Sequence, residues 1–297
     1  MTAPRTCDVL VVGGGGAGLA AAIEARQAGA SVVLLEKNEK LGGSTAWSIG
    51  SITATGTPHQ RKRGIEDSPD GHFADMPGFA GPLAARENDV LRRILCDEVP
   101  DAFRWLLDLG VRFHGPMPEP PHRQPRMHNV LPNSLSYIHH LGKRARATGV
   151  DIRLGARVES LTAEAGRVTG ARCVDGRIFH ATRGVILAAG DFTNDPELKA
   201  RYMGDAAAKV DGVNATATGD GLHEQREAHP IGSLDQHLVR GRSVDAARVT
   251  RGEQRERLGE PDDPRHRHVE ARDLGLGVAK IRHDRDGAQA EAARLHA

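Results

Sequence analysis

The sequence is poor in aromatic residues. Phe, Trp and Tyr make up 3% of its 297 residues, and Tyr202 is the last of them in the chain. Everything beyond it lacks the side chains that bury the most area in a core. Leu, Ile, Val and Phe also fall below about a fifth of residues 222–297, the level at which a stable core becomes doubtful. We therefore expect this segment to be an irregular tail of low order.

Cysteine is almost as scarce. Only Cys7, Cys96 and Cys173 occur, far apart, and the chain has no C-x-x-C. An odd number of widely separated cysteines argues against a disulfide framework. Three reduced thiols are typical of a cytoplasmic protein, and we expect that location.

Strong charge and long apolar runs are also missing. The formal net charge is +1, which implies no general affinity for nucleic acid or for an acidic membrane. No apolar run is long enough to cross a bilayer, and the first residues do not read as a signal peptide. We expect no nucleic-acid partner and no membrane span.

A metal site is not predicted either. His122, His128, His139 and His140 lie within a short region. They lack a regular ligand spacing, and no nearby cysteine or acidic pair completes a set. Residues 115–133, which are rich in Pro, His and Arg, are interpreted instead as a loop.

The most informative stretch that is present is residues 9–22, VLVVGGGGAGLAAA. Gly13, Gly15 and Gly18 fit G-x-G-x-x-G between an apolar strand and an alanine-rich helix. The first glycine allows a tight turn, the second lets a diphosphate approach the backbone, and the third lets the helix pack closely. The N–H groups at the helix start, around Gly16 and Ala17, would face that diphosphate.

A carboxylate follows at the distance that a dinucleotide site requires. Residues 31–35 read as a second buried strand, and Glu36 stands at its end, 18 positions past Gly18. There it can accept hydrogen bonds from ribose hydroxyls, and it disfavours a cofactor with a 2′-phosphate. The alternative is a glycine-rich surface turn followed by an unrelated Glu.

Residues 37–50, KNEKLGGSTAWSIG, narrow the prediction. With them the chain resembles the FAD-binding half of the fumarate reductase, succinate dehydrogenase flavoprotein and 3-ketosteroid dehydrogenase family. In that family a GGST or GGNT segment follows the ribose-binding Glu and wraps the flavin. The resemblance implies FAD as the cofactor, with contacts from Lys37, Gly42, Gly43, Ser44, Thr45, Ser48 and Gly50.

Two later segments extend the resemblance to about residues 6–221. The family motif A-T-G-G-F reads Ala188-Ala189-Gly190-Asp191-Phe192 here, with Asp in place of the second Gly, and T-G-D-G spans residues 218–221. The further FAD contacts that this implies are Val158, Ala189, Gly190 and Asp220. Plain core strands of any α/β domain would explain Val158 equally well.

The predicted fold is α/β: a Rossmann-like FAD-binding domain, with a parallel sheet and a β-ribbon, over residues 1–221. It carries a helical insertion at about residues 57–134. We expect Pro100 to split the apolar run 88–109 into two helices. Residues 134–148 read as a helix, with Leu135 on its apolar face, and 150–154 as a strand. Asp175-Gly176 predicts a hairpin within 166–181, and 185–188 reads as a separate strand.

The resemblance implies an FAD-dependent oxidoreductase that transfers hydride between the flavin and a CH–CH bond of an enoate or steroid-like substrate. Two alternatives stay open: a truncated, non-catalytic FAD-binding remnant, and an NAD-dependent Rossmann dehydrogenase. No catalytic residue is assigned, because the family's C-terminal motifs are not found in residues 222–297. We expect the chain to be a truncated or frame-shifted member of the family, with a natural disordered extension as the alternative. This leaves open whether the chain is an enzyme by itself.

The tail generates the first testable prediction. Residues beyond about 225 should be cleaved early in limited proteolysis, because they cannot bury enough apolar area to offset chain entropy. Mass spectrometry of the fragments identifies the cleavage sites. A full-length chain that resists the protease would contradict the prediction.

Overall fold

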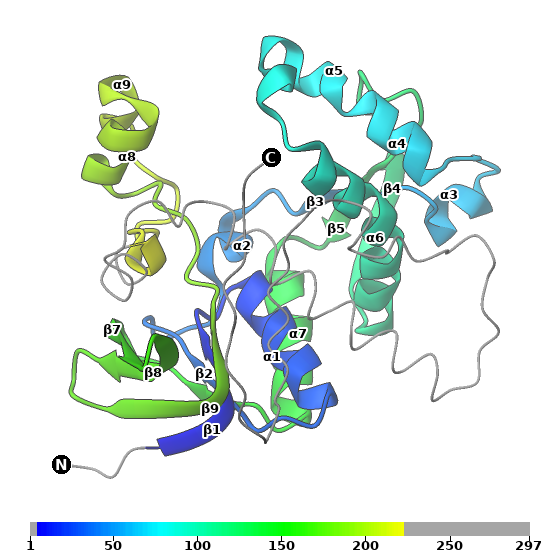
Figure 1. Cartoon of the computed structure of the whole chain (residues 1–297). Coiled ribbons are helices and arrows are strands. Elements are labelled where there is room, and N and C mark those ends of the chain that lie inside the picture. The colour runs from blue at the N-terminus through cyan, green and yellow to red at the C-terminus, as the bar shows by residue number, and fades with distance from the viewer. Residues whose placement is uncertain (1–4, 223–297) are drawn as a thin grey trace, which may run out of the picture. The chain divides into compact units, whose positions relative to one another are not determined.

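The computed structural model describes residues 5–222, which are built around a six-stranded sheet (Figure 1). Residues 1–4 and 223–297, including nearly all of the expected tail, lie outside the described residues. The strand order is β6-β2-β1-β9-β8-β7. The strands are β1 (Arg5–Val12), β2 (Val32–Leu35), β6 (Asp151–Arg153), β7 (Val158–Glu164), β8 (Arg167–Cys173) and β9 (Ile178–Leu187).

The sheet joins a parallel half to an antiparallel ribbon. β6, β2, β1 and β9 run parallel, whereas β9, β8 and β7 pair antiparallel. This arrangement confirms the predicted sheet and ribbon. The prediction of a separate strand at 185–188 is wrong, because β9 runs on from the hairpin. β9 pairs with β8 along one edge and with β1 along the other, so one strand belongs to both the ribbon and the parallel sheet.

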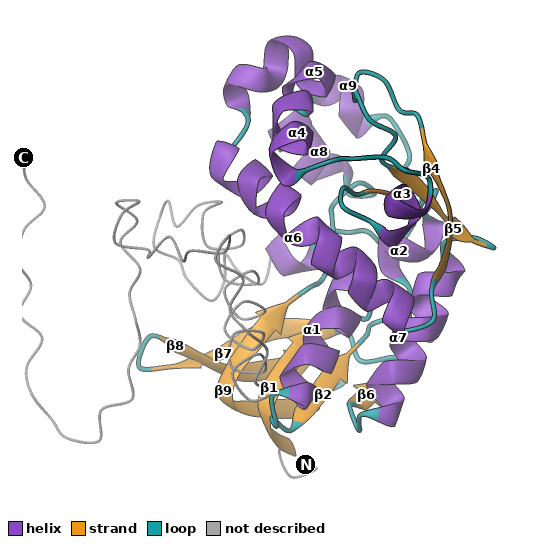
Figure 2. Ribbon diagram, turned by 90° about the vertical axis from the view of Figure 1, so that its right-hand side faces the viewer, coloured by secondary structure: helices purple, strands orange, loops and turns teal. Residues whose placement is uncertain are grey.

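Each face of β1 and β2 packs on a different layer. Val11 and Leu34 point to one face, towards α1 (Gly16–Gln27) and α7 (Leu135–Ala147), which lie side by side in both views (Figures 1 and 2). Leu10 and Leu35 point to the other face, against the ribbon. Strands buried on both faces read as continuous apolar runs, as these two do.

The predicted helix 134–148 is confirmed as α7, and Gly149 follows it with a φ of +83°. Leu141 and Ala145 face the core, at 3% and 0% exposure. The prediction for Leu135 is wrong, because its side chain is 57% exposed. It is the first residue of the helix.

The insertion is largely helical, as predicted, but Pro100 does not split its long helix. α6 runs unbroken through this residue. Val99 and Phe103 lie on either side of Pro100 and are both buried in one core, which holds the two halves on one axis. The helices here are α3 (Pro58–Lys62), α4 (Pro69–Asp75), α5 (Pro77–Ala80), the 3-10 helix Gly81–Arg86 and α6 (Asp89–Asp108).

A small antiparallel sheet lies where the sequence predicted only a loop. Its order is β3-β5-β4. His128 and Val130 of β5 point to the core, at 0% and 4% exposure, whereas Met127 and Asn129 face a cavity. The flanking prolines hide this alternation in the sequence. The strands are β3 (Ser51–Thr53), β4 (Arg112–Met117) and β5 (Met127–Leu131).

A buried ion network joins this sheet to the helices of the insertion. Arg126, directly before β5, is 1% exposed. Its guanidinium donates to both carboxylate oxygens of Asp67, each at 2.7 Å, and to Asp75 at 2.7 Å. A buried charge is tolerated only when paired in this way. The network therefore fixes where β5 begins relative to α4.

Besides α1, α7 and the helices of the insertion, the described residues form α2 (Gly43–Trp47), and α8 (Pro196–Met203) and α9 (Asp205–Ala208) after β9. The Asp195 side chain caps α8 by accepting from the Leu198 N–H at 2.8 Å. Cys7, Cys96 and Cys173 are all buried, and none forms a disulfide. Within residues 5–222, no helix is long and apolar enough to span a membrane.

The buried histidines generate a prediction on pH. Burial lowers the pKa of His72 and of His128 to about 4. Both are neutral in the fold, whereas the unfolded chain takes up their protons near pH 6.5. The free energy of unfolding should therefore fall as the pH is lowered from about 6.5 to 4.

Chemical unfolding at several pH values measures this slope. The His72→Phe variant should show a shallower pH dependence than the parent. The matched control is His114→Phe, because His114 is exposed. A parent whose stability is flat across this window would contradict the assignment of neutral buried histidines.

Candidate functional site

A hollow opens at the carboxyl ends of β1, β2 and β9. Its volume is about 140 Å³. In parallel α/β sheets this edge is where ligands bind. We call it the glycine hollow. It is lined by residues 12–17, 35–38, 43–45, 188–191 and 216–217, and by Ala156, Val158, Asn214 and Asp220.

The three motif glycines have different roles. A Cβ on Gly18 would lie 1.8 Å from the Gly13 carbonyl oxygen, and one on Gly13, whose φ is +108°, would lie 2.3 Å from the Ala188 oxygen. The packing of the chain itself thus demands glycine at both positions. At Gly15 a Cβ would meet nothing closer than 3.7 Å. The chain does not need glycine there, so the open approach at Gly15 is available to a ligand.

Glu36 closes one end of the glycine hollow. Its side chain is 5% exposed, and both carboxylate oxygens accept backbone hydrogen bonds. Gly14 N–H donates to Oε2 at 2.7 Å, and Asn38 N–H donates to Oε1 at 2.9 Å. These bonds fix the carboxylate at the end of β2. Each oxygen keeps a lone pair that could accept a hydroxyl.

The start of α2 lies against the start of α1. Gly42 and Gly43 have φ values of +154° and +51°, a backbone that other residues rarely adopt. Gly43 lies beside Gly15, and Thr45 Oγ1 accepts from the Gly16 N–H at 3.2 Å. The glycine loop and the GGST segment therefore form one continuous wall.

A second wall comes from residues 214–220. The Lys37 ammonium donates to Asp220 at 3.1 Å and to Thr218 at 2.9 Å. Hydrogen bonds from Thr218 and Lys37 hold the pKa of Asp220 below its ordinary value, although burial alone would raise it. Asn38 also donates to Thr216, at 3.2 Å. Lys37 and Asn38, shortly after the end of β2, thus hold the segment 214–220 in place.

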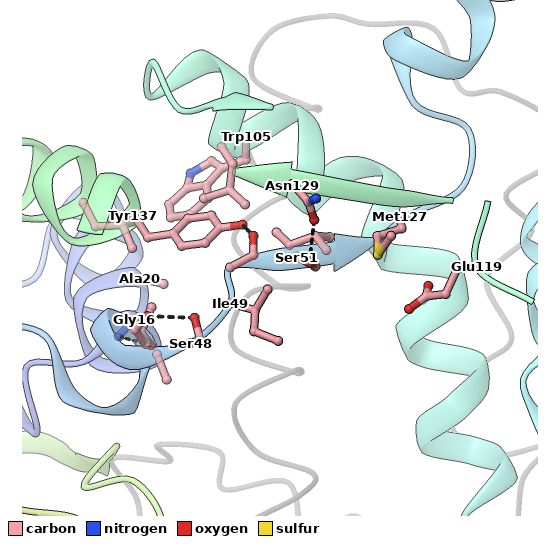
Figure 3. Close-up of a pocket in the computed structure, with 16 residues that line it drawn as sticks. Gly16, Ala20, Ser48, Ile49, Ser51, Trp105, Glu119, Met127, Asn129 and Tyr137 are labelled. Atoms are coloured by element: carbon pink, nitrogen blue, oxygen red, sulfur yellow. Dashed lines mark hydrogen bonds between the residues drawn. The ribbon is translucent and has the colours of Figure 1, made fainter. Parts of the chain in front are cut away.

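A larger cavity of about 830 Å³ adjoins the glycine hollow (Figure 3). Gly16, Ala17 and Thr45 line both. Residues 48–52 form one side of it, and Trp105 both packs on the core and lines this cavity. We call it the apolar cavity.

Tyr137 supports the wall of the apolar cavity. Its hydroxyl donates to the Gly50 carbonyl at 2.8 Å (Figure 3). Burial raises the pKa of Tyr137 well above its ordinary value. Ser134 donates to the Ala46 carbonyl at 2.8 Å. The first turn of α7 thus holds both ends of the segment 46–50.

Most of the residues predicted for the site lie together. Gly18 packs on Gly13, and Gly42 directly precedes Gly43, which lines the glycine hollow. Ser48 and Gly50 line the apolar cavity. The others line the glycine hollow: Gly13, Gly15, Gly16, Ala17, Glu36, Lys37, Gly43, Ser44, Thr45, Val158, Ala189, Gly190 and Asp220.

The sequence analysis missed several lining residues, among them Asn38, Asn214 and Thr216. No motif marks them, and Asn38 and Thr216 are 178 positions apart. Of the four histidines, only His139 and His140 lie side by side, with ring centroids 5.0 Å apart, whereas His128 bonds Thr57 at 3.1 Å and His122 bonds Arg126 at 2.8 Å. Across residues 5–222, no three His, Cys, Asp or Glu side chains are grouped to hold a metal ion.

Fold and hollow together define a dinucleotide-binding flavoprotein domain of the Rossmann type. The FAD binding domain family matches residues 8–239, and the chain belongs to this family. Its cofactor is FAD. The match extends past residue 221, where the resemblance was expected to end.

Comparison with individual proteins agrees with this family assignment. The chain is 32% identical to the NADH:fumarate oxidoreductase of Klebsiella pneumoniae over 74% of its own length and 24% of that protein. An open flavocytochrome c3 fumarate reductase superposes with a TM-score of 0.70, at 31% identity, over 76% of this chain and 41% of that one. A 3-ketosteroid-Δ4-(5α)-dehydrogenase of Rhodococcus jostii RHA1 superposes with a TM-score of 0.65, at 26% identity, over 75% of this chain and 54% of that one. The chain thus spans between a quarter and about half of these proteins.

The space at Gly15 generates a prediction. Gly15→Ala and Gly15→Val should fold like the parent, since a Cβ there meets only ordinary contacts, but both should bind FAD more weakly. Valine should be the worse of the two, because its branches fill the approach of the diphosphate. Thermal unfolding without FAD tests whether the variants fold like the parent, and a fluorescence titration with FAD tests whether they bind FAD more weakly. The matched control is Gly18→Ala, which should lose stability as well. Normal FAD affinity in Gly15→Val would contradict this role.

Proposed function

We propose that residues 5–222 form the FAD-holding part of an oxidoreductase. In this proposal the adenosine ribose lies at Glu36 and the diphosphate at Gly13, Gly15 and the start of α1. The flavin ring extends into the apolar cavity beside residues 48–51. The observation that carries the proposal is the open approach at Gly15, which the packing of the chain does not explain.

The residues present fit such a cofactor. Helix α1 offers the N–H groups of its first turn and the positive end of its dipole to the diphosphate. Thr45, which accepts from Gly16, can still donate its own hydroxyl. The apolar cavity is lined by apolar side chains such as Ile52, Leu106 and Met127, which suit a flat aromatic ring.

When bound, FAD supplies hydride chemistry at its ring, and the protein orients the ring and handles protons. We propose hydride transfer between the flavin and a CH–CH bond of a small enoate or steroid-like molecule, in line with the fumarate and ketosteroid relatives. Because the matched family binds FAD, an NAD-dependent dehydrogenase is not favoured.

Proton transfer needs a separate group. Tyr137 is a poor candidate, since its hydroxyl is committed to Gly50 and its pKa is raised. Glu119, which lines the apolar cavity, accepts from Thr53 at 2.8 Å. Ser48 donates to the Thr45 carbonyl at 2.8 Å. We therefore assign no catalytic residue among those described.

A visible spectrum is the first test. The purified chain should show flavin absorbance, and Glu36→Ala should weaken FAD binding about tenfold to a hundredfold, since losing hydrogen bonds to a charged acceptor costs roughly 1.5–3 kcal/mol. The exposed Glu39 provides a matched control, Glu39→Ala. A colourless protein that takes up no added FAD would contradict the proposal.

The reaction is tested with two assays. Reduced-dye-driven reduction of an enoate and dye-coupled desaturation of a ketosteroid are run with the FAD-loaded chain. We expect neither to exceed free FAD, because Tyr137, Glu119 and Ser48, which line the apolar cavity, are held in hydrogen bonds to other groups. Turnover that Gly15→Val abolishes would show that the chain holds a proton donor.

A further inference from the structure

The glycine hollow carries an unbalanced set of charges. Its lining includes three carboxylates, those of Glu36, Asp191 and Asp220, and one cation, Lys37. Lys37 pairs with Asp220 at 3.1 Å, and Arg157, which is outside the lining, lies 3.5 Å from the same carboxylate. Glu36 and Asp191 are therefore the lining carboxylates without a cationic partner among the described residues. Asp191 has no ion-pair partner within 4.0 Å among the residues that the structure describes. A ligand that brings negative charge into this hollow thus meets an excess of negative charge.

Asp191 lies close to the glycine loop. Its segment enters along that loop, because a Cβ on Gly13 would lie 2.3 Å from the Ala188 oxygen and 3.1 Å from the Ala189 Cα. Its carboxylate reaches across to the start of α2, where the Ser44 hydroxyl donates to it at 2.8 Å. The Asp191 charge is therefore held against the GGST segment, in the lining of the glycine hollow.

The surroundings keep Asp191 ionised. Burial alone would raise the pKa of this carboxyl, but hydrogen bonds from the Thr193 side chain and N–H and from Ser44 hold it below its ordinary value. The Thr193 bonds are 2.6 and 2.9 Å long. At neutral pH the side chain is a fixed negative charge.

The bond to Asp191 also limits which hydrogen bonds Ser44 can make. Its hydroxyl proton goes to Asp191, and its oxygen accepts from the Asn214 amide at 3.1 Å. A hydroxyl has one proton to donate. Ser44 therefore cannot donate to a phosphate oxygen while it bonds Asp191, so the GGST wall has one phosphate donor fewer than its sequence suggests.

We propose that the Asp191 carboxylate repels the diphosphate of FAD, so that this chain holds its flavin as an exchangeable ligand. The inference rests on the proposed function, which places the diphosphate at the glycine loop. Like charges a few ångströms apart at a protein surface repel strongly enough to change affinity by about tenfold or more.

A purely structural role for Asp191 has the opposite sign. If its only task were to hold Ser44 and Thr193 in place, its loss would loosen the wall and weaken binding of every ligand. If it repels the diphosphate, loss of its charge tightens only ligands that carry phosphates. The direction of the change therefore separates the two roles.

The experiment measures the affinities of adenosine, ADP and FAD for the parent and for Asp191→Asn. Asparagine keeps an oxygen that can accept from Thr193 but removes the charge. We expect ADP and FAD to bind about tenfold more tightly at low salt, with adenosine unchanged. The matched control is Asp108→Asn, which removes a charge from an exposed residue at the end of α6 and should change none of the three.

Salt dependence tests the same idea without a variant. At about 0.5 M salt the Debye length is shorter than about 5 Å, so the repulsion is screened. The parent should then bind ADP more tightly, relative to adenosine, than at low salt. This readout keeps the inference falsifiable if Asp191→Asn fails to fold.

The outcomes are distinct. Weaker or unchanged binding of ADP and FAD to a folded Asp191→Asn variant, or an ADP-to-adenosine ratio in the parent that falls with salt, overturns the repulsion. A parent and variant that both bind no FAD overturn the proposed function, and the repulsion with it. FAD binding that tightens in the variant supports both.

Discussion

The contact between Gly13 and Gly18 is the constraint on which the site depends. The carbonyl oxygen of Gly13 occupies the space that a side chain at Gly18 would need. This close approach sets α1 against the end of β1 and turns its first N–H groups towards the glycine hollow. Two hydrogen bonds then fix the neighbouring segments against the glycine loop: Thr45 accepts from the Gly16 N–H at 3.2 Å, and Glu36 accepts from the Gly14 N–H at 2.7 Å.

Local patterns in the sequence predicted the parallel sheet, the ribbon and most of the site. The apolar runs of β1 and β2, the glycine motif and Glu36 lie within a short stretch, so their spacing alone determines their arrangement. The hairpin at Asp175-Gly176 is equally local. The errors came where tertiary packing overrides a local rule: α6 continues through Pro100 because Val99 and Phe103 are buried in one core.

What could not be predicted depends on partners far apart in the chain. Lys37 and Asp220 were each predicted as cofactor contacts, but nothing in the sequence indicates that they pair at 3.1 Å, because they are 183 positions apart. Arg126 lies in a stretch rich in Pro, His and Arg that suggests a solvated loop, yet it is 1% exposed and paired with Asp67. Burial of a charge is a property of the fold around it, and no spacing within the sequence reveals it.

The unequal demands on the motif glycines bear on how such a chain can evolve. The fold itself requires glycine at positions 13 and 18, so selection for a folded protein preserves both. It does not require glycine at position 15, where a Cβ would meet nothing closer than 3.7 Å, and in the proposed function Gly15 serves only the ligand. A descendant released from the need for its cofactor could replace Gly15 without unfolding. Substitution at this one position would therefore be an early mark of a lineage that has kept the architecture and abandoned the chemistry.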